Sequence, residues 1–111
     1  MSVTNAALRK RVERLIAKWC PVLGLESWGL TVLFDEPTAM ATCALPNGSK
    51  YEEAVLRFNL TRMKRELVPT FAAWEEIVVH ELCHCLLAPH DSETRVSRVT
   101  RTILRARDLG R

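Results

Sequence analysis

Two histidines and a glutamate stand at a spacing that suits binding a metal ion and activating a water molecule. They form the pattern His80-Glu81-x-x-His84 inside an apolar stretch, residues 78–87. Because residues four apart lie on nearly the same face of a helix, His80 and His84 can both direct an imidazole nitrogen at one ion. Glu81 lies one step around the helix, where its carboxylate can reach a water molecule in an open position of the ion. Zinc lowers the pKa of bound water to about 7, and Glu81 is therefore expected to take its proton as the catalytic base.

The same pattern could also occur in a buried helix without a metal, in which each histidine has a backbone or carboxylate partner. The surroundings favour the metal, because apolar residues cover nearly every side of the segment and indicate a central helix. These residues are Phe71, Trp74, Ile77, Val78, Leu82, Cys83, Leu86 and Leu87. Unpaired polar side chains in such a helix are costly, and one ion would satisfy three of them. The sequence therefore predicts a zinc site.

A catalytic zinc site normally has three protein ligands and a water molecule, so a third ligand is needed. His90, Asp91 and Glu93 follow the histidine pair closely enough to supply it. Glu93 shares a helix face with Val96 and Val99, and a carboxylate on a buried face needs a charged partner. We therefore favour Glu93, with His90 as the main alternative and Asp91 as a further one. Glu93 could also be an ordinary first-turn acid that stabilises the helix dipole.

His90 occupies the place of the third histidine in the metzincin pattern, His-Glu-x-x-His-x-x-Gly-x-x-His. The chain departs from that pattern in two places. Leu87 stands where metzincins have a glycine that lets the backbone turn, and no methionine follows Met63 to form the Met-turn of that family. The position of Glu93 is instead similar to that of the gluzincins, in which a glutamate of the following helix completes the site. With Glu93 as ligand, His90 and Asp91 would support the ligands or act as electrophiles.

Helical periodicity predicts a first helix with an apolar face, capped by Thr4 or Asn5 and ending before Pro21. Its apolar residues are Leu8, Val12, Leu15, Ile16 and Trp19. The central helix is expected to be capped by Thr70 and to end near Leu87, because Ala88-Pro89 does not continue a helix comfortably. A last helix follows Ser92 and ends at Gly110. Its apolar face comprises Val96, Val99, Ile103 and Ala106.

Alternating apolar residues predict strands between the first and the central helix. Residues 28–35 form one strand that ends at Glu36-Pro37, residues 40–45 form a weaker one, and residues 54–61 form a better one. A turn is expected at residues 46–49, Pro-Asn-Gly-Ser, and a polar loop at residues 62–69. The fold class is therefore α+β, a single domain over residues 1–111, with a small antiparallel or mixed sheet backed by the central helix.

Composition indicates a globular chain with a mild positive charge of +3. No apolar run is long enough to span a membrane, and the start of the chain lacks the pattern of a secretory signal, so we expect a cytoplasmic protein. In a reducing compartment, cysteines are thiols rather than disulfides. The four are Cys20, Cys43, Cys83 and Cys85. Cys83 lies near the histidine face, but structural zinc sites usually draw their ligands from separate loops.

The chain resembles the small zincin-type metallopeptidases of phages and bacteria, and its central block is similar to minimal gluzincins and to SprT-like domains. The resemblance rests on residues 54–58, 76–84 and 87–89, and on Glu93 with Val96 and Arg98. It implies zinc ligands His80, His84 and Glu93, with Glu81 as general base. It also implies an edge strand that holds an extended peptide by strand addition, which would be residues 54–61. For the oxyanion, Tyr51, His90 and Arg95 are the candidates.

Two functions follow from these patterns. The first is a zinc-dependent peptidase that hydrolyses peptide bonds of a peptide or protein substrate. The second is a metal-stabilised binding module without turnover, which would bind nucleic acid through basic residues. These residues are Arg62, Lys64, Arg65, Arg95, Arg98, Arg101 and Arg105. A basic stripe is more often just a solvated face, so the peptidase is the leading hypothesis.

Overall fold

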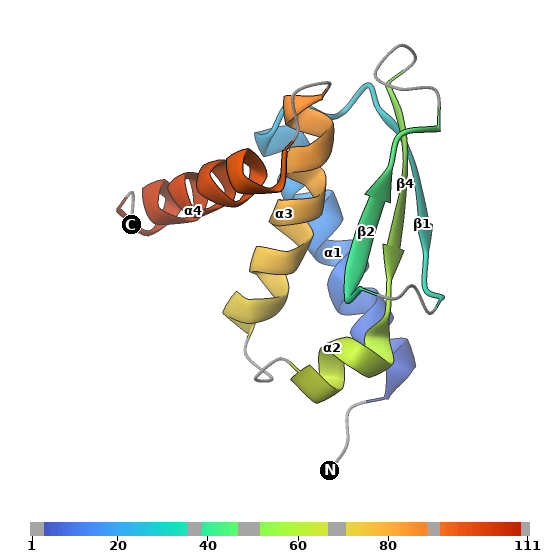
Figure 1. Ribbon diagram of the computed structural model, residues 1–111. Helices are drawn as coiled ribbons and strands as arrows, with labels where there is room; N and C mark the ends of the chain where they lie inside the picture. Colours follow the sequence, from blue (N-terminus) through green and yellow to red (C-terminus); the bar gives the residue numbers. More distant parts are fainter. Residues whose placement is uncertain (1–3, 36–38, 47–51, 67–70, 89–91, 110–111) are drawn as a thin grey trace.

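The computed structural model has an α+β fold of helices and a small sheet (Figure 1). It describes residues 4–35, 39–46, 52–66, 71–88 and 92–109. In these ranges the helices are α1 (Asn5–Val22), α2 (Leu60–Glu66), α3 (Phe71–Leu87) and α4 (Glu93–Leu109). The strands are β1 (Gly29–Leu33), β2 (Ala41–Ala44) and β4 (Glu53–Phe58). The predicted fold class is confirmed. None of the helices in these ranges combines the length and apolar character that crossing a bilayer requires.

The sheet is mixed, with the strand order β1-β4-β2. β4 lies in the middle and pairs with β1 in parallel, with Val32 opposite Leu56. On its other side β4 pairs with β2 in the antiparallel sense, with Cys43 opposite Leu56. Ala54, Leu56 and Phe58 of β4 are buried, as their alternation predicts. The expectation that residues 54–61 form an edge strand is wrong, because β4 has a neighbour on each side.

Two helices cover the sheet and share its core. Figure 1 shows α1 and α3 on the same side of the sheet, while α4 extends from the end of α3 away from the strands. Most of the largest fully buried side chains come from α1, β4 and α3, including Leu15, Phe58, Trp74 and Leu82. α3 therefore lies between α1, β2 and α4, the position expected for a central helix.

α1 begins as predicted but ends later. The Thr4 hydroxyl accepts a hydrogen bond from the Ala7 backbone N–H at 3.2 Å, which identifies Thr4 as the cap. Pro21 lies inside the helix rather than beyond its end. Gly24, at φ 71°, terminates the helix, since its N–H and that of Leu25 donate to the carbonyls of Pro21 and Cys20. A proline in the last turn removes only one helical hydrogen bond, so the helix continues past Pro21 and ends just before Gly24.

α2 replaces most of the predicted loop at residues 62–69. The Asn59 side-chain oxygen accepts a hydrogen bond from the Arg62 backbone N–H at 3.0 Å and caps the helix. Leu60 and Met63 are buried, whereas the polar residues between them face outward. Arg62 also pairs with Glu66 at 2.7 Å, one turn later. The loop prediction failed because Asn59 and Leu60 were counted as part of the preceding strand.

α4 buries its apolar face only in part. Val96 is fully buried and Val99 and Ile103 are half-buried, but Ala106 is exposed, contrary to the prediction. The reason is that α4 extends from α3 away from the sheet, so its second half lies farther from the strands (Figure 1). Several predicted boundaries lie outside the described residues: Glu36-Pro37, most of the turn at 46–49, residues 67–69, the cap Thr70, and Gly110.

Candidate metal centre

The side chains of His80 and His84 converge with that of Glu93 where α4 begins beside α3. The His80 Nε2 atom lies 3.0 Å from Glu93 Oε2, and the His84 Nε2 atom lies 2.9 Å from Glu93 Oε1. The two imidazole rings are 5.3 Å apart and inclined by 72°. The structure therefore brings together the three residues that the sequence analysis favoured as ligands.

The donor set fits a zinc ion. One nitrogen from each histidine and one carboxylate oxygen all lie within 4.8 Å of one another. Ligand atoms of a tetrahedral zinc, at about 2.0–2.2 Å from the ion, are separated by about 3.4 Å, so these three need only small adjustments to share it. Two imidazoles with one carboxylate also form the donor set of several catalytic zinc sites, which keep a fourth position open.

The three side chains differ in exposure. His84 is 11% exposed, His80 is 21% exposed, and Glu93 is 74% exposed. The histidines are thus held by the packing of α3, whereas the carboxylate faces solvent at the first residue of α4. A metal at this point would be bound by the two histidines of the buried helix α3 and would remain accessible to water on the side of Glu93.

Glu81 lies beside this cluster and is 6% exposed. Burial raises the pKa of its carboxyl to about 7, with a lowering effect from His84 and a raising effect from Glu93. A pKa near the working pH suits a group that both takes and returns a proton. A cation at His80 and His84 would lower the pKa and keep more of the carboxylate ionised.

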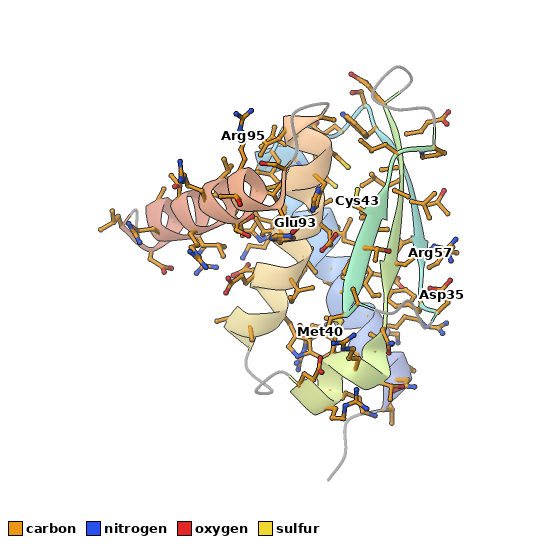
Figure 2. The ribbon with its side chains drawn as sticks, in the orientation of Figure 1. Asp35, Met40, Cys43, Arg57, Glu93 and Arg95 are labelled. Carbon is orange, nitrogen blue, oxygen red and sulfur yellow. The ribbon has the colours of Figure 1, made fainter. Side chains whose placement is uncertain are left out.

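An open groove of about 500 Å³ runs between β2 and α3 and contains the cluster. Its walls are residues 39–43 of the β2 side and, from the helices, Glu76, Ile77, His80, Glu81, His84 and Glu93. Figure 2 shows Met40 and Cys43 along β2, and Glu93 where α4 meets α3. The cluster of His80, His84 and Glu93 therefore shares one cleft with Glu81 and with residues of β2.

The strand that borders the groove is β2, not residues 54–61 as the sequence analysis expected. Within the described ranges β2 pairs only with β4, so its other edge borders the groove. Glu76 and Ile77 also line the groove, which was not predicted. Their spacing was informative, because residues three and four before His80 share its helix face.

The remaining candidates are less well placed or not described. His90, Asp91 and Tyr51 lie outside the described residues. Arg95 is exposed on α4 and does not belong to the groove wall. Cys83 is fully buried and lies outside the metal-ligand cluster. No disulfide joins the four cysteines, all of which lie in the described residues.

Comparisons with protein-family models, with curated proteins and with solved structures found no match for this chain. The function of the protein must therefore be inferred from the chemistry of its own residues. The features that bear on its function are the cluster of His80, His84 and Glu93, the buried carboxyl of Glu81, and the groove that contains them.

Proposed function

We propose that the protein is a zinc-dependent peptidase that hydrolyses peptide bonds in the groove between β2 and α3. The observation that carries the proposal is the position of Glu81, a buried carboxyl in the wall of the groove beside three side chains spaced to hold one ion. A structural metal site needs no titratable carboxyl pointing into an open groove. A hydrolytic site needs that group within reach of the attacking water.

Each residue then has a distinct task. His80, His84 and Glu93 would hold the zinc, with His90 or Asp91 as the alternative third ligand. The zinc, when bound, supplies positive charge that polarises the scissile carbonyl and acidifies water. Glu81 takes the proton from the attacking water and passes it to the departing amine nitrogen. The low exposure of Glu81 keeps bulk water from competing for that proton.

The substrate class follows from the groove. An extended peptide can pair its backbone with the open edge of a strand, and side-chain pockets then select the sequence. β2 offers such an edge within the described residues, and Glu81 lies across the groove from it. An unfolded or flexible polypeptide segment is therefore the expected substrate, since a folded domain could not supply a free strand.

The proposal is tested with fluorescently labelled casein as an unfolded substrate. The zinc-loaded protein should release labelled peptides, a chelator should stop the release, and added zinc should restore it. A zinc-loaded protein that is folded but cleaves neither casein nor a library of unstructured peptides would overturn the proposal.

Nucleic-acid binding is a second candidate function because of a basic groove on α4. Arg98, Arg101 and Arg105 line it together with Thr94, Ser97 and Thr102, and it reaches Glu93. The three arginines are exposed and form no ion pair with the described carboxylates. Guanidinium and hydroxyl groups in one groove are suited to phosphate.

A DNA fragment tests this function through its salt dependence. If three phosphate contacts form, the binding constant should fall with salt at a log–log slope of about −2 to −3. Replacing Arg98 and Arg101 by glutamine should flatten the slope by about two units, whereas the matched change of Arg14 on α1 should leave it unchanged. Absence of binding at low salt would eliminate this function.

A further inference from the structure

Two cysteine side chains meet where β2 packs against α3, beside the groove that contains the candidate metal centre. The Cys43 Sγ atom on β2 lies 3.9 Å from the Cys85 Sγ atom on α3, although the residues are 42 positions apart. Cys43 is half-buried and lines the groove, whereas Cys85 is 2% exposed. A small molecule in the groove can thus reach Cys43, and the sulfur of Cys85 lies buried next to it.

We propose that Cys43 and Cys85 form a redox site, in which hydrogen peroxide converts the two thiols into a disulfide between β2 and α3. The sulfurs must approach by about 1.9 Å to reach the disulfide bond length of about 2.05 Å. A shift of that size is within the range of side-chain rotation combined with a small movement of an edge strand. Cys43 belongs to such a strand, since β2 is bonded on one side only within the described residues.

The reaction proceeds in two balanced steps. The Cys43 sulfur, after losing its proton, attacks one oxygen of the peroxide, the O–O bond breaks, and hydroxide leaves, giving a sulfenic acid at Cys43. The Cys85 sulfur then attacks the Cys43 sulfur, the S–S bond forms, and the sulfenic oxygen leaves as water. The two thiols lose two electrons and two protons in total, and one peroxide becomes two waters.

The disulfide would change the groove itself. Cys85 follows the candidate ligand His84 directly in α3, and Cys43 belongs to the groove wall formed by β2. A covalent bond between them would fix β2 against α3 and narrow the space for a peptide. On the proposed function, on which this consequence rests, oxidation should reduce peptide cleavage severalfold, and dithiothreitol should restore it.

The linkage is assigned by mass spectrometry, with variants that resolve an ambiguity of the sequence. Trypsin would place Cys20 and Cys43 in one peptide, residues 19–50, and Cys83 and Cys85 in another, residues 66–95. A disulfide between these peptides therefore does not identify its own cysteines. The double variant Cys20→Ser/Cys83→Ser leaves only the proposed pair, and peroxide should lower its mass by two hydrogen atoms and join the two peptides.

The single variants Cys43→Ser and Cys85→Ser are the matched counterparts, and both should fail to join these peptides under the same treatment. Circular dichroism like that of the reduced protein, and a monomeric mass only two hydrogen atoms lower, would confirm a folded, intramolecular product in the oxidised double variant. The proposal is overturned if the folded double variant forms no disulfide, or if the peptides are still joined in either single variant. These readouts do not depend on peptidase activity, so the redox site and the proposed hydrolysis can fail independently.

Discussion

Replacing Glu81 by glutamine is expected to remove peptide hydrolysis while leaving metal binding intact. The amide has the size of the carboxyl and fits the same buried position, but it cannot accept a proton from water. Loss of a general base typically costs about 10²- to 10⁴-fold in rate, and kcat/KM on an unstructured peptide should fall by that amount. The zinc content of the variant should remain at the wild-type value because Glu81 is not one of the three clustered ligands.

Glu76→Gln provides the matched control for this substitution. Glu76 belongs to the same helix and lines the same groove, but it is exposed and outside the ligand cluster. Its replacement should change kcat/KM by less than about threefold if it makes only a rim contact. Equal activity of Glu81→Gln and wild type would remove Glu81 from the mechanism, and equal losses in both variants would point to a general effect of groove charge.

Replacing Glu75 by alanine is expected to cause a large loss of stability. The Glu75 side chain is 3% exposed and is contacted by groups from two other helices. Its Oε2 atom accepts hydrogen bonds from Lys18 Nζ at 2.8 Å and from the Trp19 indole N–H at 2.9 Å. Its Oε1 atom is paired with the Arg107 guanidinium of α4. One buried carboxylate therefore links α1, α3 and α4.

Loss of this carboxylate leaves the Trp19 N–H buried without its acceptor, removes the counter-charge of Lys18, and leaves Arg107 with Asp108 alone. Removing one partner of a buried ion pair costs about 3–5 kcal/mol, and the partial exposure of Lys18 and Arg107 places the expected loss near the lower end, about 3 kcal/mol. Urea unfolding measures this loss as a lower midpoint at an unchanged slope.

Glu76→Ala, one position along the helix, is the control for stability and should change the free energy of unfolding by less than about 0.5 kcal/mol. A Glu75→Ala variant as stable as this control would show that the three-helix network does not stabilise the fold.

Local patterns predicted the elements that local interactions determine. The apolar spacing of α1 and α3 and the alternation of β4 were read correctly because each pattern reflects one buried face. α2 was missed because its signal is short. Asn59 continues the alternating pattern of the strand, whereas in the structure its side chain accepts a hydrogen bond from the Arg62 N–H and caps α2. The end of α1 depended on the backbone conformation of Gly24, which weighs more than the presence of Pro21.

For the candidate site, the ligand residues were predictable from the sequence, but the groove was not. His80 and His84 needed only helical spacing, and Glu93 needed only the assumption that its helix packs against theirs. The groove was not predictable, because strand order is a matter of distant pairing: β4 follows β2 in sequence yet lies between β2 and β1. The contacts of Glu75 with Lys18 and of Cys43 with Cys85 span 57 and 42 positions, beyond the reach of periodicity.

The metal content of the purified protein tests the central claim most directly. After dialysis against zinc and removal of excess metal, elemental analysis should find one zinc per chain in the wild type and in Glu76→Gln. His84→Ala should retain much less than one, because a catalytic zinc site that loses one of its three ligands cannot hold the ion tightly. Wild-type protein without stoichiometric zinc, or a His84→Ala variant that keeps it fully, would contradict a metal centre at His80, His84 and Glu93.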